Sequence, residues 1–272
     1  MRIAYQGEPG AYSEAAALRL NSDAEVIPRS SFEEVFTAVS AQKVTHGIIP
    51  IENTIGGTIH RNYDLLLEHE LPIVGEVKLL IQHHLIVLNG TSKDQVRRVY
   101  SHPQGLAQCD LFLRTLKSVE IVATYDTAGS AKMIKEQNLE NSAAIASERA
   151  AKHFDLKVLE SGIQDYKDNF TRFLLIGKED RPLGQPDKTT IVFSVNNEAG
   201  ALVKALSVFA EREIDLTKLE SRPIPAKPFE YLFYADLVTH REDVQCVRAL
   251  KHLSEFAASI RVLGSYPSWS QS

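Results

Sequence analysis

The chain has 272 residues, of which 44% are hydrophobic and 24% charged, a composition typical of globular proteins. This length suggests about two domains. A formal net charge of −5, with no run of lysine or arginine, argues against a nucleic-acid partner. The only two cysteines, Cys109 and Cys246, lie far apart in the sequence and outside any CxxC pair, so neither a disulfide framework nor a zinc site is expected.

The N-terminus runs directly into a strand pattern at residues 3–5, without the apolar stretch and small-residue cleavage site of a signal peptide. No segment approaches the roughly 18 uninterrupted apolar residues of a membrane span. We therefore expect a soluble, cytoplasmic protein that does not interact with a membrane.

The first part of the chain alternates between strand and helix patterns. Strands are predicted at residues 3–6, 25–28 and 47–51, and helices at residues 11–20, from residue 31, and at 60–69. Pro72–Leu88 is then a long β-favouring run that contains a glycine. Because it is too long for one ordinary strand, we expect it to bend or to cross between two lobes.

A second alternation of strands and helices follows this run. Strands are predicted at residues 96–101, 120–123, 143–146 and 157–159, with helices at 103–116, 127–136 and 147–153. Such alternation favours a largely parallel sheet covered by helices. The two alternations predict two α/β lobes with a cleft between them, lobe one from about 1–77 plus 162–180 and lobe two from about 78–161.

The sequence pattern changes after residue 177. Lys178–Lys188 is polar and contains two prolines and a glycine, which indicates a linker. Beyond it, the predicted elements follow a βαββαβ order, which is the ferredoxin-like plan. We therefore divide the chain into a first domain at 1–180, a linker at 181–188 and a second domain at 189–272.

Three polar segments follow predicted strands in the first domain, where ligands of open α/β sheets bind. The segment Glu52–Thr58 carries two glycines that permit close backbone approach to an anion. The segment Ser101–Gln108 opens a helix, whose N-terminus attracts carboxylates. Taken alone, Glu52–Thr58 is equally well interpreted as an ordinary loop with a helix cap. Ser101–Gln108, taken alone, is better interpreted as a capped amphipathic helix with a turn histidine.

The third polar segment, Asp168–Gly177, has a polar front and an apolar back. Residues 174–176 predict a short buried strand, which places Thr171 and Arg172 at its mouth between two phenylalanines. A hydroxyl and a guanidinium placed in this way can hold a small anion and hydrogen-bond its leaving group. The local alternative is a strand start with a solvated arginine.

Two kinds of bound group are not expected. No second histidine stands near His102 at metal-ligand spacing, and His83 and His84 would point to opposite faces of a strand, so the sequence predicts no metal site. Neither GxGxxG nor GxxxxGK[ST] is present, so it predicts no nucleotide cofactor. Cys109 lies in an apolar helix and is expected in the core.

In the second domain, Asn197–Val203 is a strand-to-helix loop, and Leu219–Pro223 lies near the end of the following strand. In a βαββαβ fold, both segments are expected on the same side of the sheet, at its edge. Such a module could bind an amino acid between two copies of itself. The alternative is a small structural or dimerising domain.

Together these segments resemble the prephenate dehydratase family over nearly the whole chain. The resemblance rests on five motifs that occur in order: Glu52–Thr54, Ser101–Gln104 with Gln108, Asn169–Phe173, Gly200–Val203 and Glu220–Pro223. It implies a two-lobed catalytic domain shaped like a type II periplasmic binding protein, followed by a ferredoxin-like ACT regulatory domain. It also implies a homodimer or homotetramer that L-phenylalanine inhibits.

The resemblance implies conversion of prephenate to phenylpyruvate, water and CO2, with no cofactor. Aromatisation drives the reaction. The residues it implies as catalytic are Thr171, Arg172, Glu52, Asn53, Ser101, His102, Gln104 and Gln108. Those implied to bind substrate are Thr54, Gly56, Gly57, Thr58, Asn169, Phe170 and Phe173. Those implied to bind phenylalanine are Asn197, Ala199, Gly200, Ala201, Leu202, Val203, Glu220, Ser221, Arg222 and Pro223.

For the mechanism, we expect Arg172 and the backbone N–H groups of residues 52–58 to bind an anion. Thr171 is the expected hydrogen-bond or proton donor to the departing hydroxyl, with Glu52 and His102 as rival acids. Two alternative functions stay open. One is arogenate dehydratase, the same chemistry on an amino side chain, and the other is a non-catalytic cytoplasmic amino-acid sensor with a solute-binding fold.

Overall fold

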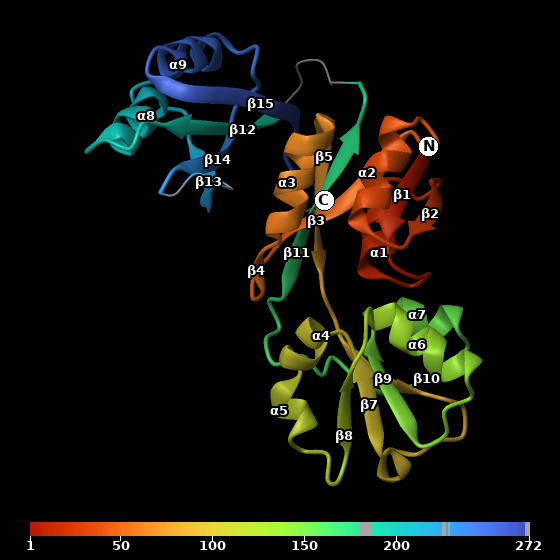
Figure 1. Ribbon diagram of the computed structural model, residues 1–272. Helices are drawn as coiled ribbons and strands as arrows, with labels where there is room; N and C mark the ends of the chain where they lie inside the picture. Colours follow the sequence, from red (N-terminus) through yellow and green to blue (C-terminus); the bar gives the residue numbers. More distant parts are fainter. Residues whose placement is uncertain (180–186, 225–226, 228, 270–272) are drawn as a thin grey trace. The chain divides into compact units, whose positions relative to one another are not determined.

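The computed structural model describes residues 1–179, 187–224, 227 and 229–269, and it has a mixed α/β fold (Figure 1). The strands of these residues form three sheets. The chain makes two compact units, one of residues 1–65 with 77–174 and one of residues 66–76 with 175–272. Within the described residues, no helix is long and apolar enough to span a membrane.

The first sheet has the strand order β2-β1-β3-β11-β5, and β1 lies parallel to both neighbours. A two-residue strand, β4, turns back against the end of β3. The strands are β1 (Arg2–Gln6), β2 (Glu25–Arg29), β3 (His46–Asn53), β4 (Gly57–Thr58), β5 (Ile73–Leu80) and β11 (Phe170–Gly177). The helices that accompany them are α1 (Tyr12–Leu20), α2 (Phe32–Ser40) and α3 (His60–His69).

The second sheet has the order β10-β6-β9-β7-β8. Here β7 is parallel to β8 and β9, whereas β6 is antiparallel to β9 and β10, so the sheet is less parallel than the sequence suggests. Its strands are β6 (His84–Val87), β7 (Arg98–Ser101), β8 (Glu120–Ala123), β9 (Ser142–Ala146) and β10 (Lys157–Ser161). Its helices are η1 (Lys93–Gln95), α4 (Pro103–Ala107), α5 (Asp110–Leu113), α6 (Thr127–Glu136) and α7 (Glu148–His153).

The chain crosses between these two sheets twice, from β5 to β6 and from β10 to β11. The crossing segments are hydrogen bonded to each other, because Ile81 N donates to Asn169 O at 2.7 Å and Ile163 N donates to His83 O at 3.0 Å. The β-favouring run 72–88 is therefore two strands with a crossing between them. The second crossing carries Asn169 and leads directly into Thr171.

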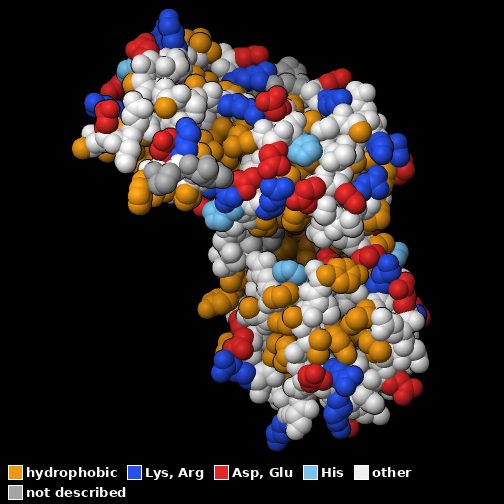
Figure 2. All heavy atoms as spheres, viewed as in Figure 1, with side chains coloured by type: hydrophobic (Ala, Val, Ile, Leu, Met, Phe, Trp, Pro, Cys, Tyr) orange, Lys and Arg blue, Asp and Glu red, His pale blue; other side chains and the backbone are white. Residues whose placement is uncertain are grey.

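The third sheet has the order β13-β14-β12-β15, with all pairs antiparallel. Its elements follow the predicted βαββαβ order: β12 (Asp187–Val195), α8 (Ala201–Ala210), β13 (Leu216–Pro223), β14 (Tyr231–Leu237), α9 (Val244–Ser254) and β15 (Ala257–Pro267). Side chains from the sheet and both helices, Phe193, Phe209 and Leu253 among them, pack into one apolar core. On the visible face of the molecule, acidic and basic side chains are interspersed (Figure 2).

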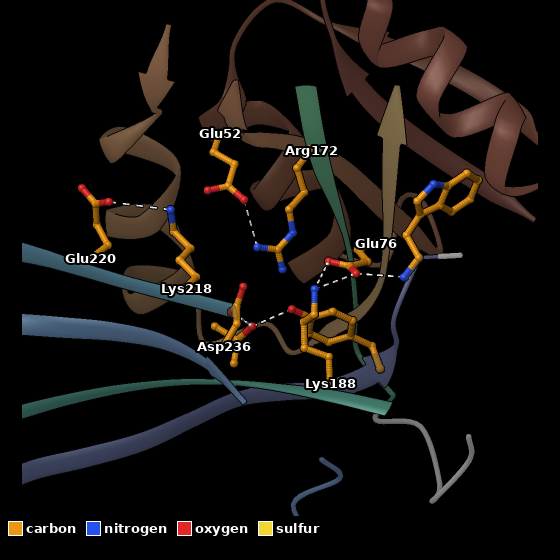
Figure 3. A network of polar contacts seen from close by, with 10 residues as sticks. Glu52, Glu76, Arg172, Lys188, Lys218, Glu220 and Asp236 are labelled. Carbon is orange, nitrogen blue, oxygen red and sulfur yellow. Dashed lines mark hydrogen bonds and ion pairs between the residues drawn. The ribbon is translucent and has the colours of Figure 1, made fainter. Parts of the chain in front are cut away.

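The last two residues of the predicted linker belong to a strand. Asp187 and Lys188 are buried and begin β12, while residues 181–186 lie outside the described residues. The Lys188 ammonium contacts the buried Glu76 carboxylate of β5 at 2.8 Å, and Trp269 N donates to the same carboxylate at 2.8 Å (Figure 3). Within the second unit, β12 and the C-terminal segment are thus joined to β5.

Candidate active site

A cavity of about 420 Å³ lies within the first unit, and it is lined by strands of the first sheet and by helix starts and loops that accompany both sheets. Figure 2 shows a hollow here with hydrophobic side chains beside it. Its polar wall brings together the three segments that the sequence predicts to meet, through Asn53, His102, Gln104, Gln108 and Thr171. This volume lies within the range of small-molecule sites, about 300–1,000 Å³.

Three side-chain amides form a closed ring beside the cavity. Asn53 Nδ2 donates to Asn169 Oδ1 at 2.7 Å, Asn169 Nδ2 donates to Gln108 Oε1 at 2.9 Å, and Gln108 Nε2 donates to Asn53 Oδ1 at 3.3 Å. The backbone N–H groups of Ile55 and Gly56 also donate to Asn53 Oδ1, which fixes the orientation of that amide. All three amides are buried, so their hydrogen bonds hold this wall rigid.

The ring positions the hydroxyl of Thr171. Asn53 Nδ2 donates to Thr171 Oγ1 at 2.9 Å. Within the described part of the chain, this is the hydrogen bond that Thr171 Oγ1 makes, and it uses an acceptor lone pair. The hydroxyl proton therefore remains available to a ligand in the cavity, which Thr171 lines.

His83, which the sequence reading set aside, supports the same ring from behind. Its Nε2 lies 2.9 Å from Gln108 Oε1, and because that oxygen only accepts, Nε2 carries the proton. Its Nδ1 lies 2.9 Å from the Tyr12 hydroxyl. The Tyr12 hydroxyl itself donates to Gln82 O at 2.7 Å. Burial lowers the pKa of His83, which favours the neutral form of its ring.

Arg172 does not join Thr171 in the cavity. Successive side chains of a strand point to opposite faces, so Thr171 faces the cavity while Arg172 points away from it. The buried Arg172 guanidinium contacts the Glu52 carboxylate at 3.2 Å, and Figure 3 shows the two side chains pointing toward each other. The expectation that the hydroxyl and guanidinium share one crevice is therefore wrong.

The loop after β3 does not offer the expected anion site either. The N–H groups of residues 54–56 already have acceptors, since Ile55 and Gly56 donate to Asn53 Oδ1 and Thr54 donates to Phe170 O. The Thr54 hydroxyl, in turn, accepts from Phe170 N and donates to Asp168 O. Gly57 and Thr58 form β4 and, like Gly56, are not among the cavity-lining residues. This loop holds the ring in place rather than binding a ligand through its backbone.

The remaining predicted residues also fall into two groups: some line the cavity, and others only support its wall. The buried Ser101 hydroxyl donates to Ile145 O at 2.7 Å, so it joins β7 to β9. His102 lines the cavity and caps α4 by accepting from Gln104 N. Phe173 lines the cavity. Phe170 and the fully buried Asn169 instead support the cavity wall through the hydrogen bonds described above.

The sequence reading missed the helix starts that line the cavity. The first residues of α1, α2 and α6 all face it, together with Gln6 at the carboxyl end of β1. Asp126, the N-cap of α6, is among them, and burial raises the pKa of its carboxyl group. The rule that ligands bind beyond strand ends applied to β1 and β2 as well and would have pointed to these residues.

Metal-binding side chains do not cluster in the part of the chain that the structure describes: it contains no group of three or more histidine, cysteine or acidic residues that could hold an ion. Cys109 is fully buried in the apolar core of the second sheet. Burial raises the pKa of its thiol to about 12, which keeps it protonated and unreactive at neutral pH.

The two segments expected to bind phenylalanine lie in the third sheet. Gly200 adopts a positive φ of 83° as the N-cap of α8, so the strand-to-helix turn there uses a conformation that favours glycine. Glu220, Ser221, Arg222 and Pro223 belong to the edge strand β13, while the Asn197–Gly200 loop follows β12. Since β14 separates these strands, the two segments do not adjoin in the sheet of one copy.

Comparison with known proteins agrees with this architecture. The family model described as prephenate dehydratase matches residues 3–181, and the ACT domain model matches residues 189–255. A relative from Arabidopsis thaliana, named arogenate dehydratase/prephenate dehydratase 2, chloroplastic, is 49% identical over 278 residues, covering 98% of this chain and 73% of its own.

Two solved structures share the fold over almost their full length. One, titled a prephenate dehydratase in complex with L-Phe from Arthrobacter aurescens, has a TM-score of 0.88 and 28% identity, covering 98% of this chain and 90% of its own. The other, titled GqqA, a novel type of quorum quenching acylases, has a TM-score of 0.90 and 32% identity, covering 99% and 98%. The family resemblance and the fold class are confirmed: the chain is an enzyme of the prephenate dehydratase family, with a type II periplasmic-binding-protein-like catalytic region followed by an ACT domain.

Proposed function

We propose that this enzyme removes water and CO2 from prephenate to give phenylpyruvate in L-phenylalanine biosynthesis. The observation that carries the proposal is the Asn53–Thr171 hydrogen bond, which leaves the Thr171 hydroxyl proton free to bond a departing oxygen. The rigid amide ring behind Asn53 fixes that hydroxyl before substrate arrives. A cavity whose remaining walls carry apolar side chains such as Ile81, Phe32 and Phe173 suits a six-membered carbon ring.

In this reaction the bond between the ring and its carboxylate breaks, and its electron pair forms the new ring double bond. The carbon–oxygen bond to the ring hydroxyl breaks at the same time, and the departing oxygen takes a proton to leave as water. Thr171 hydrogen-bonds that oxygen as negative charge develops on it. Of the two rival acids, His102 lines the cavity, whereas Glu52 contacts Arg172 away from it.

The test is an assay of the full chain with prephenate, following phenylpyruvate by its absorbance. The expected result is turnover about 10²–10³-fold slower in Thr171→Val, with prephenate binding by calorimetry retained. Binding without turnover in the unaltered chain would instead support the amino-acid sensor.

Arogenate is the second candidate substrate, and two observations favour it. The relative of 49% identity carries arogenate dehydratase in its name. In addition, the described cavity lining contains two carboxylates, Glu33 and Asp126, but no lysine or arginine. Arogenate differs from prephenate in an ammonium group, for which a carboxylate is the natural partner.

Comparing kcat/KM for the two substrates decides between them, and Asp126→Asn sharpens the comparison. Asparagine keeps the oxygen that accepts from Gly129 N at the start of α6, so the variant removes the charge but not the cap. If Asp126 receives the ammonium group, kcat/KM for arogenate falls about tenfold or more while that for prephenate does not.

For regulation, we propose that L-phenylalanine binds the ACT domain between Asn197–Val203 of one copy and Glu220–Pro223 of another, in a cytoplasmic homodimer or homotetramer. The separation of these segments by β14 within one copy supports a site shared between copies. Gly200→Val strains the positive-φ turn and should abolish inhibition by phenylalanine without lowering uninhibited turnover. Light scattering would report the oligomer, and retained inhibition in Gly200→Val would place the site elsewhere.

A further inference from the structure

The start of helix α1 differs from the other long helices that face the cavity. Helix α2 is capped by the Ser31 side chain and α6 by the Asp126 side chain. The N-cap of α1 is Ala11, which has no side chain able to accept a hydrogen bond. The N–H groups of Ser13 and Glu14, which a capping side chain would take, have no acceptor in the described part of the chain.

A second feature at the same place also lacks a partner. Ser13 is only 7% exposed and lines the cavity. Among the residues that the structure describes, no group hydrogen-bonds its hydroxyl. A buried hydroxyl without a partner costs free energy, and here it points into a cavity beside N–H groups that also lack partners. Such a set of donors fits a carboxylate.

The segment before α1 is held firmly in place. Gly10 has a φ of 89°, and its Cα packs so closely on the Ala150 backbone that no side chain fits there. Ser147 Oγ donates to Gly10 O at 2.6 Å. The buried Glu14 carboxylate accepts from Gly10 N at 2.9 Å and contacts Arg149 at 2.6 Å. The Arg149 contact offsets the charge of Glu14, which would otherwise oppose an anion at this helix start.

We infer that the N-terminus of α1, with the Ser13 hydroxyl and the N–H groups of Ser13 and Glu14, binds the carboxylate of the substrate's three-carbon side chain. This inference rests on the proposed function, which requires a binding site for the substrate's carboxylate. The two groups expected to supply that site are already engaged, because Arg172 pairs with Glu52 and the N–H groups of residues 54–56 have acceptors. The ring carboxylate is excluded on chemical grounds: stabilising it at a helix N-terminus would oppose its loss as CO2. Prephenate and arogenate share the side-chain carboxylate, so the assignment holds for both.

The test measures Ser13→Ala against a matched control, Ser31→Ala. Both remove a hydroxyl at the start of a helix beside the cavity, but the Glu34 N–H group at the start of α2 already has the Ser31 hydroxyl as acceptor, so α2 lacks the set of unpaired donors found at α1. Losing a hydrogen bond to a charged group predicts that Ser13→Ala raises KM about tenfold to hundredfold, with kcat changed less than about threefold. Ser31→Ala should lower Tm and leave KM within about twofold.

Calorimetry in a Thr171→Val background gives the dissociation constant for prephenate without turnover, and adding Ser13→Ala should raise it by the same factor as KM. An unchanged KM and dissociation constant would overturn the assignment. Binding of prephenate without turnover of either substrate in the unaltered chain would overturn the proposed function but leave the assignment standing. Absence of prephenate binding would overturn both.

Discussion

The two faces of strands β3 and β11 use neighbouring residues for different purposes. On the cavity face, Asn53 holds the Thr171 hydroxyl, and on the other face Glu52 contacts Arg172 (Figure 3). Each pair joins the same two strands, and within each strand the two residues are consecutive. The motifs Glu52–Asn53 and Thr171–Arg172 therefore each contribute one residue to each pair, and strand alternation decides which residue faces the cavity, where we propose the catalytic role.

The comparison also separates polar groups that are satisfied by the fold from those that await a ligand. The carboxylate of Glu52 and the guanidinium of Arg172 satisfy each other. The hydroxyl of Thr171 accepts a hydrogen bond and keeps its proton for the cavity. Substituting a side chain that keeps a hydrogen-bonding group for a ligand should therefore change turnover more than stability.

The largest effect is expected for Thr171→Val, which keeps the shape of the side chain and removes the hydroxyl. We expect kcat to fall about 10²–10³-fold, because a donor to the developing charge is lost, with KM changed far less. Steady-state kinetics on the preferred substrate measure this, and Thr171→Ser should restore much of the rate. An unaltered kcat in Thr171→Val would show that this hydroxyl takes no part in the reaction.

Asn53→Asp should follow, with kcat lowered about 10²-fold. The carboxylate can still accept from the N–H groups of Ile55 and Gly56, but it cannot donate to Thr171 or Asn169. The substitution thus separates positioning of Thr171 from support of the loop. Loss of folding, seen as a collapsed far-UV circular dichroism spectrum, would assign Asn53 to stability instead.

Glu52→Gln and Arg172→Met test the other face. Each breaks the contact between the two side chains, and we expect the free energy of unfolding to fall by about 1–3 kcal/mol, with kcat within about threefold. Denaturant titration and kinetics on the same preparations give both quantities. A hundredfold loss of kcat at unchanged stability would contradict the division between the two faces.

The smallest effect is expected for His83→Gln, which should lower kcat/KM about threefold to tenfold by loosening Gln108. Because burial lowers the pKa of His83, its contribution to stability is complete above the ordinary value of 6.5 and is lost as pH falls through the lower folded-state value. The control is His84→Gln: burial also lowers the pKa of His84, but it is not among the residues that line the cavity. The acid limb of kcat should shift only in the His83 variant.

Much of the architecture follows from sequence periodicity. Alternating strand and helix patterns predict both α/β sheets, and the βαββαβ order predicts the third sheet. The burial of Lys188 was not predicted, because a lysine in a polar segment resembles a surface residue in sequence, whereas here its charge is buried against Glu76, 112 positions away. The sequence of a polar segment does not show which distant residue will pair with it inside the folded protein.

The site was predicted in part. The segments carrying Asn53, Gln108 and Thr171 meet as expected: Asn53 ends β3, Gln108 ends the helix that follows β7, and Thr171 lies at the start of β11. Arg172 was misplaced even though alternation along β11 is visible in the sequence, because the phenylalanines on either side suggested a shared crevice. The position of Ser13 beyond β1 could have been noted from the sequence, but its importance depends on Ala11 failing to cap α1 and on burial beside the cavity, which only the structure shows.

The central claim is that Asn53 acts on the reaction through Thr171, and a double-mutant cycle on kcat tests it most directly. If Asn53 only positions the Thr171 hydroxyl, the enzyme carrying both Asn53→Asp and Thr171→Val should turn over about as slowly as Thr171→Val alone. Losses that multiply, so that the double variant falls by the product of the two single effects, would show that the two side chains act independently and would contradict the account.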